Sequence, residues 1–538
     1  MRRPASSRPR FLAARALLAL VVLFALATPA AARVFVIGVD GGSWGVIDPM
    51  LARGELPHLA ALMARGVAAR MDTVEPVISP TVWTSIATGR SPAAHGVTGF
   101  LATRLSRRVP TIFERLAARG LRVGLYDWLV TWPPNAPAGG FVIPGWLRRD
   151  PSVAPADVWT RAGVTPYFWE ANARTPDGFV ARAREEVVRK APTWNALAAA
   201  FLLDVGGVTF YSVDATSHRF WQDAFPGQFG DVKPAEPSAY AGVIPEVMRG
   251  IDRSVGEIVA GLSPDDTVIV VSDHGFQADT RGRRRIWVMQ LADHLSQFGL
   301  DPDRDGFNFV GEFFAVVLRV RPGPIAERDA VTERWAALLR GAHATGGQPI
   351  FSGVEVVDAA PRPPGAERPW LTRARQAAVR LVLRYAFDEH LEAPAHAWVI
   401  ARPDHEVLDA LWPDGTVEIG GVRLPVREAA HPDDFSGRHE PTAVFVAAGG
   451  PVRPVSGRAR VSVLDVAPLV AYLAGQPIPD DLEGRLPADW IAPAWLAAHP
   501  ARHEPAPPWR PEGGGADVPG AADDAAVIER LRALGYVR

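Results

Sequence analysis

Continuous apolar runs recur along the chain and alternate with segments of helical periodicity. Apolar runs without polar interruption are typical of strands that are buried on both faces of a sheet. These runs are residues 34–39, 122–126, 207–213, 267–272 and 442–447. Helical periodicity is found between them, at residues 44–53, 57–65, 240–261, 326–340 and 370–386. The alternation predicts an α/β fold with a mostly parallel central sheet and helices on both faces.

The alternation of predicted strands and helices is interrupted in the second half of the chain. Residues 281–430 carry separate strand and helix signals and several Pro/Gly breaks, so we interpret them as an inserted α+β cap. The catalytic α/β core is then divided between residues 33–280 and 431–500. Residues 501–538 are predicted to be a linker rich in Pro, Gly and Ala, followed by a short C-terminal helix.

The first 32 residues have the features of a secretory signal peptide. Residues 2–15 carry five arginines and no acidic residue, an apolar run from Leu17 to Ala27 follows, and small residues precede Arg33. The apolar run is shorter than the roughly 20 residues of a membrane span. An uncleaved anchor is the alternative. We expect a bacterial protein that is periplasmic or secreted, with no stable membrane span once the signal is removed.

The composition narrows the possible chemistry. The chain has 57 basic and 59 acidic residues, for a formal net charge of −2, so nucleic-acid binding is not expected. It contains no cysteine, which excludes disulfide frameworks, thiolate metal sites and cysteine nucleophiles.

Acidic and imidazole side chains gather at the ends of the predicted strands. They are Asp40, Asp214, His218, Asp273, His274 and His439. Sites in open α/β sheets form at the carboxyl ends of the strands. Carboxylate oxygens and imidazole nitrogens suit Zn²⁺ or a similar divalent ion, and six ligands suit two ions about 4 Å apart. Taken singly, each residue could be a turn or cap residue, so the prediction of a two-metal site depends on the whole set.

A nucleophile candidate, Ser79, lies just before a predicted helix at residues 82–87. A hydroxyl at a helix start lies near unpaired backbone N–H groups and the positive end of the helix dipole, both of which favour a bound phosphate. A bridging metal ion would supply the lowered hydroxyl pKa that serine otherwise lacks.

Together these residues resemble the alkaline phosphatase superfamily, specifically its type I phosphodiesterase/nucleotide pyrophosphatase branch. The resemblance covers residues 34–280 and 430–490 well and the cap poorly. The matching segments are residues 36–42, 54–67, 79–96, 214–218, 271–276, 437–439 and 464–475.

The resemblance implies the role of each site residue. One metal ion would be held by Asp214, His218 and His439. The other would be held by Asp40, Asp273, His274 and the oxygen of the nucleophile. The spacing to Thr88-Gly89 places the family's nucleophile on Ser79, with Thr81 as the reserve candidate because Pro80 makes the local register uncertain. His95 matches a segment that is structural in the family.

The activity implied is hydrolysis of phosphate esters through a phosphoserine intermediate, with two divalent metal ions, expected to be zinc. The substrate would be a small-molecule, lipid or glycan phosphate ester. Nucleotide-cleaving relatives have an asparagine three residues after the nucleophile, where this chain has Val82, so one oxyanion donor is lost. Sulfatases share the fold but need a C/S-x-P-x-R pattern, which residues 79–83 do not fit.

Three alternatives remain open. A related enzyme could transfer a phosphoryl or phosphoethanolamine group to a lipid or glycan. An exported protein on this fold could bind a metal or a glycan without catalysis. Residues 41–45 match the G-x-S-x-G pattern of α/β-hydrolases, with Ser43 as the nucleophile, although that elbow should follow a central strand preceded by others and not the first strand.

Overall fold

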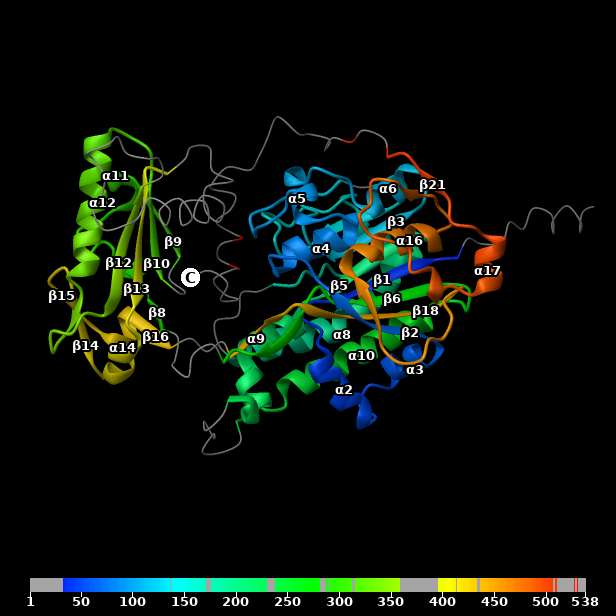
Figure 1. Cartoon of the computed structure of the whole chain (residues 1–538), viewed down its shortest axis with the longest axis horizontal. Coiled ribbons are helices and arrows are strands. Elements are labelled where there is room, and N and C mark those ends of the chain that lie inside the picture. Colours follow the sequence, from blue (N-terminus) through cyan, green and yellow to red (C-terminus); the bar gives the residue numbers. More distant parts are fainter. Residues whose placement is uncertain are drawn as a thin grey trace, which may run out of the picture.

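A large α/β core and a smaller part rich in β-strands make up the protein (Figure 1). The computed structural model describes residues 32–135, 137–170, 176–229, 238–280, 287–289, 291–311, 315–358, 395–412, 414–432, 436–506, 509, 527 and 530. The predicted signal peptide up to residue 31, the predicted helix at 370–386 and most of the predicted linker and C-terminal helix lie outside the described residues.

The core is built on an eight-stranded sheet with the order β19-β2-β18-β6-β1-β5-β3-β4. The strands are β1 (Val34–Val39), β2 (Gly66–Asp72), β3 (Val123–Trp128), β4 (Phe141–Pro144), β5 (Val205–Phe210), β6 (Thr267–Val271), β18 (Thr442–Gly449) and β19 (Ala459–Ser462). Strand β18 is antiparallel to both of its neighbours, and the other pairings are parallel. The predicted mostly parallel sheet is therefore confirmed, and the central strands β1, β5 and β6 are buried along their whole length.

Helices cover both faces of this sheet, as predicted (Figure 1). One face carries α2 (Trp44–Ala52), α3 (Pro57–Arg65), α8 (Pro176–Ala200), α9 (Ser212–Ala224) and α10 (Val243–Ala260). The other face carries α4 (Ser79–Thr88), α5 (Pro92–His95), α6 (Ile112–Ala118) and α16 (Val466–Leu473). This double cover explains why the central strands are continuous apolar runs in the sequence.

Several elements differ from the sequence-based expectation, among them β5, α4 and α8, and the strands β2, β4 and β19 were not predicted. Strand β5 ends at Phe210 and α9 begins at Ser212, so the predicted strand at 207–213 runs too far. Helix α4 begins at Ser79 and not at residue 82. The 25-residue helix α8 was not predicted, because its apolar face is interrupted by Pro192 and by two buried charged residues, Glu186 and Lys190.

The smaller part has sheets and an apolar core of its own. Its four-stranded antiparallel sheet has the order β12-β13-β10-β9, from β9 (Phe307–Gly311), β10 (Val316–Val320), β12 (Phe351–Asp358) and β13 (Ala397–Pro403). Helix α12 (Ile325–Arg340) packs on this sheet through the buried Trp335. Strands β8 (Trp287–Met289) and β16 (Ala430–Pro432) form a two-stranded sheet. A three-stranded sheet has the order β11-β14-β15, from β11 (His343–Ala344), β14 (Thr416–Ile419) and β15 (Val422–Pro425).

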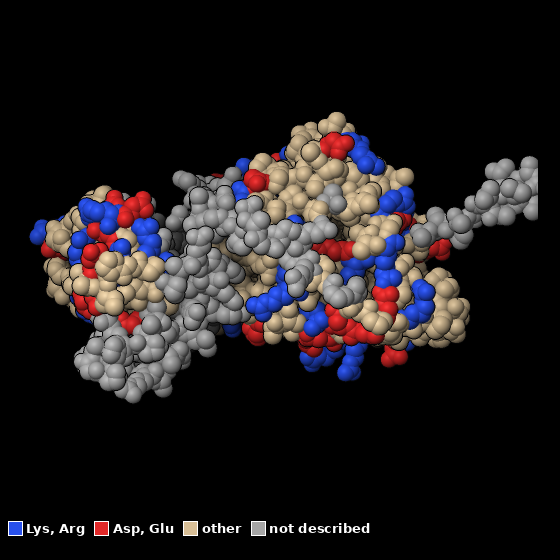
Figure 2. Space-filling view, turned by 90° about the horizontal axis from the view of Figure 1, so that it is seen from above, with Lys and Arg blue, Asp and Glu red and all other residues tan. Residues whose placement is uncertain are grey.

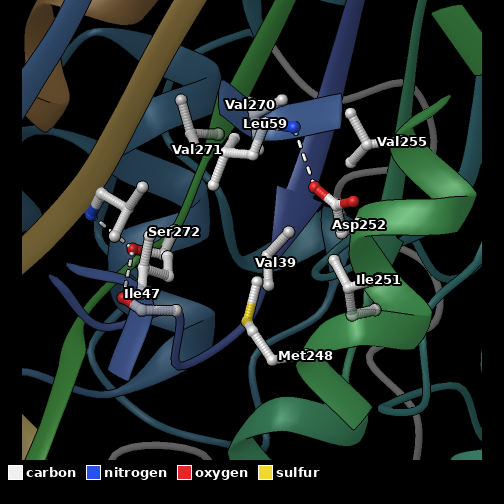
Figure 3. Close-up of a pocket in the computed structure, with 12 residues that line it drawn as sticks. Val39, Ile47, Leu59, Met248, Ile251, Asp252, Val255, Val270, Val271 and Ser272 are labelled. Atoms are coloured by element: carbon white, nitrogen blue, oxygen red, sulfur yellow. Dashed lines mark hydrogen bonds between the residues drawn. The ribbon is translucent and has the colours of Figure 1, made fainter. Parts of the chain in front are cut away.

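A small cavity in the core lies between the sheet and helices α2, α3 and α10 (Figure 3). Its volume is about 10 Å³, the space of about one water molecule, and its lining is mainly apolar. The one carboxylate in it, Asp252, accepts hydrogen bonds from the backbone N–H groups of Leu59 (2.8 Å) and His58 (3.2 Å) in the first turn of α3. The cavity is therefore a packing interface with a helix-capping carboxylate.

Basic and acidic side chains are intermingled on the face of the molecule shown in Figure 2. The described surface contains many ion pairs between them, such as Arg184–Glu246 (2.7 Å) and Arg460–Asp72 (2.7 Å). Among the described residues, no helix combines the length and apolar character that a membrane crossing requires.

Candidate active site

The six predicted ligands converge at one edge of the large sheet. Asp40 directly follows β1, and Asp273 and His274 follow β6. Asp214 and His218 lie in the first two turns of α9, which begins just after β5. His439 lies in β17 (Gly437–Glu440), which pairs with β7 (Gly275–Ala278) and leads into β18. Because β18 is antiparallel to its neighbours, its beginning lies where the parallel strands end.

The first group of ligands is Asp214, His218 and His439, whose ligand atoms all lie within 4.8 Å of one another. The Nε2 atoms of the two histidines are 2.9 Å apart. Asp214 Oδ1 lies 3.4 Å from the Nε2 atom of His218 and 3.3 Å from that of His439.

The second group is Asp40, Asp273 and His274, with ligand atoms again within 4.8 Å of one another. His274 Nε2 lies 3.7 Å from Asp40 Oδ1 and 3.2 Å from Asp273 Oδ2. The two groups adjoin, because His274 Nε2 is 3.8 Å from Asp214 Oδ1 and the His274 ring stacks on the His439 ring at a centroid distance of 3.5 Å.

Backbone carbonyls fix the tautomer of all three histidines. The Nδ1 atoms of His218, His439 and His274 lie 3.1, 2.8 and 3.2 Å from the carbonyl oxygens of residues 437, 77 and 275. A carbonyl oxygen only accepts hydrogen bonds, so each Nδ1 carries the proton and each Nε2 presents its lone pair. This is the arrangement in which a histidine binds a metal through Nε2 while its other nitrogen is held by the protein.

The carboxylates of the two groups strongly perturb one another. Burial, together with the charges of Asp273 and Asp214, raises the pKa of Asp40 well above its usual value. Burial and the charge of Asp214 raise the pKa of Asp273 to about 7. So many acidic groups packed in a buried site favour a bound cation.

The nucleophile candidate Ser79 is the first residue of α4 and is buried against the second group. Its Oγ lies 3.3 Å from Asp40 Oδ1 and 3.4 Å from His274 Nε2. The reserve candidate, Thr81, is also buried, but its hydroxyl makes no hydrogen bond within the described part of the chain. Of the two hydroxyls, the structure thus brings that of Ser79 to the ligands.

Trp83 is a site residue that the sequence analysis missed. Its indole N–H donates a hydrogen bond of 2.9 Å to Asp40 Oδ2. The signal was its position four residues after Ser79, because residues at this spacing share one face of a helix.

Burial differs between the two groups. The side chains of Asp40, Asp273, His274 and Ser79 are at most 2% exposed, whereas those of His218 and His439 are 14% and 12% exposed. The site is therefore more exposed on the side of His218 and His439, and Ser79 lies deeper inside.

Two other residues singled out in the sequence have local structural roles. The hydroxyl of Ser43 accepts a hydrogen bond from the N–H of Gly45 at the start of α2 and donates one to the carbonyl of Phe276. Ser43 is thus a helix cap, which argues against the α/β-hydrolase alternative. His95 is fully buried and its Nε2 lies 2.9 Å from the hydroxyl of Ser85.

Comparison with known proteins identifies a family. The profile of the type I phosphodiesterase/nucleotide pyrophosphatase family matches residues 34–352. Among curated proteins, no sequence matches significantly.

Solved structures with a similar course of the chain share little sequence with it. The murine ectonucleotide pyrophosphatase/phosphodiesterase 5 in complex with AMP is 15% identical, with a TM-score of 0.42, and the match covers 86% of this chain and 100% of that one. Phosphonoacetate hydrolase from Sinorhizobium meliloti in complex with phosphonoformate is 16% identical, with a TM-score of 0.40, covering 82% of this chain and 96% of that one.

The α/β fold and the family match together define a phosphoric ester hydrolase of the alkaline phosphatase superfamily. Within that superfamily, the chain belongs to the type I phosphodiesterase/nucleotide pyrophosphatase family, whose profile spans more than half of its residues.

Proposed function

We propose that this protein is an exported hydrolase of phosphate esters in which Ser79 forms a phosphoserine intermediate at a site for two divalent cations, expected to be zinc. The observation that carries the proposal is the meeting of six ligands from distant parts of the chain around one buried hydroxyl. Asp214, His218 and His439 would hold one cation. Asp40, Asp273 and His274, with the Ser79 oxygen, would hold the other.

The residues present fit such cations. Asp273 Oδ2 is buried and has no hydrogen-bond partner among the described residues, so it is available as a ligand. The Nε2 atoms of three histidines face the carboxylates, with their tautomers fixed from behind. A donor set of imidazole nitrogen and carboxylate oxygen is one that zinc prefers. When bound, the cations supply charge neutralisation at the phosphate and a lowered pKa for the hydroxyl.

The chain's own groups then supply the nucleophile and hold the phosphate. Ser79 Oγ loses its proton and forms a bond to phosphorus while the bond from phosphorus to the leaving-group oxygen breaks, and the leaving group departs with a proton as the free alcohol. The N-terminus of α4 would face the phosphate, and the helix dipole there favours the negative charge of the phosphate oxygens. The N-cap residue, Ile78, makes no side-chain hydrogen bond to the N-terminus of this helix. Water then cleaves the phosphoserine, which restores the Ser79 hydroxyl and releases the phosphate product.

The substrate class is proposed from a position near the nucleophile. Val82, where nucleotide-cleaving relatives have an asparagine, is fully buried and apolar, so it offers no donor to a phosphate oxygen. We therefore propose a small-molecule, lipid or glycan phosphate ester as the substrate in preference to a nucleotide.

Export is proposed from the sequence of residues 1–32, with its five arginines, short apolar run and small residues before Arg33. The protein would act in the periplasm or outside the cell.

The test compares two serines in the mature protein, with bis(p-nitrophenyl) phosphate as the substrate. Ser79→Ala should lower kcat by at least about 10³-fold, because the group that forms the intermediate is lost. Ser43→Ala should keep kcat within about tenfold, since Ser43 caps a helix. EDTA should abolish turnover and Zn²⁺ should restore it. Full activity in Ser79→Ala, or in EDTA, would contradict the proposal.

A further inference from the structure

We propose that Trp83 is a positioning residue of this site, whose indole N–H orients the Asp40 carboxylate toward Ser79 and His274. The inference rests on the proposed function, since it concerns one of the carboxylates that would hold a cation.

The two oxygens of Asp40 are divided between two donors from the same helix. Trp83 Nε1 donates to Oδ2 at 2.9 Å, while the Ser79 hydroxyl donates to Oδ1 at 3.3 Å. Trp83 and Ser79 are one helical turn apart in α4. Because the indole holds Oδ2, the other oxygen, Oδ1, is left facing the nucleophile and His274 Nε2, which is 3.7 Å away.

The indole itself is held in a fixed place. It is fully buried, and its ring meets the Trp128 ring edge-on, with centroids 5.2 Å apart and planes at 75°. On another side it lies against β1 at Gly38, where an added Cβ would come within 2.6 Å of Trp83 Cη2. Gly38 is two residues before Asp40, so the strand that carries the ligand and the helix that carries the nucleophile meet through this indole.

Loss of the indole N–H would leave a buried carboxylate oxygen without its donor and free the carboxylate to turn. Groups that orient a metal ligand in this way typically contribute 10- to 100-fold to metal affinity or activity. A ring that only filled space would contribute to stability and not to these quantities.

Trp83→Phe tests the donor, and Trp194→Phe is its matched control. Both rings are fully buried, each meets another aromatic ring edge-on, and both changes remove the same atoms. The Trp194 Nε1 atom has no hydrogen-bond partner among the described residues, so its loss removes no hydrogen bond.

We expect Trp83→Phe to lower kcat about 10- to 100-fold with little change in KM. In equilibrium dialysis with Zn²⁺ alone, it should weaken the binding of one of two zinc ions by a similar factor. Trp194→Phe should leave both quantities within about threefold of the wild type, even if its stability falls equally.

A second pair of variants moves the ring and keeps the N–H. Gly38→Ala forces the Trp83 ring away from β1. Gly206→Ala, in β5, likewise forces away the ring of Trp194 in α8, because the added Cβ would lie 2.5 Å from Trp194 Cη2. Gly38→Ala should weaken zinc binding as Trp83→Phe does, and Gly206→Ala should not. This pair decides the question if a phenylalanine variant fails to fold.

The outcomes separate the two proposals. If the wild type binds two zinc ions and needs them, but each test variant equals its control, the role of Trp83 is refuted and the proposed function stands. If the wild type binds no zinc and is indifferent to EDTA, the proposed function fails, and the role of Trp83 with it.

Discussion

Replacing Lys190 by methionine is predicted to destabilise the core strongly. Lys190 lies on α8, and its side chain and those of its partners Asp127 and Glu186 are fully buried. Its Nζ lies 2.8 Å from Asp127 Oδ2, contacts Glu186, and donates to the carbonyl of Thr209 at 2.7 Å. Lys190→Met leaves both carboxylates in the interior without their cation.

The expected loss is about 3–5 kcal/mol of unfolding free energy, the usual cost when one partner of a buried ion pair is removed. The cost comes from the buried carboxylates left behind and not from the volume of the side chain. Restoring neutrality with Asp127→Asn and Glu186→Gln in the same chain should therefore recover part of the loss.

The measurement is urea unfolding of the EDTA-treated protein, so that metal binding does not contribute to the stability. The matched control is Arg182→Met on the same helix, which removes an ion pair to Glu185 (3.0 Å) whose side chains are 44% and 32% exposed. Exposed pairs contribute about 0–1 kcal/mol. A loss in Lys190→Met no larger than that of the control would show that the buried carboxylates do not depend on the Lys190 cation.

The ion pairs around Lys190 also connect to the helix that carries two of the candidate ligands. Glu186 accepts hydrogen bonds from the backbone N–H groups of Tyr211 (3.0 Å) and Ser212 (2.7 Å) at the start of α9. Two residues further on is Asp214, and His218 follows one turn later. We therefore expect Lys190→Met to lower activity as well as stability.

Three further predictions concern pH, metal and processing. Burial, together with the nearby Arg107, lowers the pKa of His95 from 6.5 to about 4. As the pH falls from 6.5 to 4, His95 therefore takes up a proton in the unfolded chain but not in the folded chain. Urea titrations at several pH values should show that the unfolding free energy falls by about 3 kcal/mol over this pH range. In His95→Gln the unfolding free energy should depend less steeply on pH. After EDTA treatment, Zn²⁺ at 100 times its Kd should raise the unfolding free energy by about 2.7 kcal/mol per site in urea titrations, and Asp273→Asn should lose one of the two increments. Mass spectrometry of the exported protein should show that it begins at Arg33; an exported chain that still carries residues 1–32 would contradict cleavage.

The meeting of the candidate ligands was predictable from the sequence because most of them adjoin a strand that is itself easy to recognise. Asp40 follows the buried strand β1, and Asp273 follows β6, so the parallel order of these strands places both at one edge. His439 reaches that edge because β18 is antiparallel to its neighbours, a direction that its apolar run does not reveal.

The supporting residues were less accessible to sequence reasoning. The role of Trp83 depends on contact with Asp40, 43 residues earlier in the chain, and a tryptophan within a helix is ordinarily a core residue. Helix α8 could not be recognised from its sequence, because the buried charges of Lys190 and Glu186 interrupt the apolar face by which a helix is recognised. Their partners lie in β3 and at the end of β5, and no local pattern connects these segments.

Anomalous diffraction at the zinc edge, from crystals of the mature protein grown with Zn²⁺, would locate the proposed cations. We expect two peaks, one in contact with the Nε2 atoms of His218 and His439 and the other with His274 Nε2 and the Ser79 hydroxyl. Crystals that show no zinc between these groups, or a Ser79 hydroxyl that contacts no bound ion, would contradict this expectation.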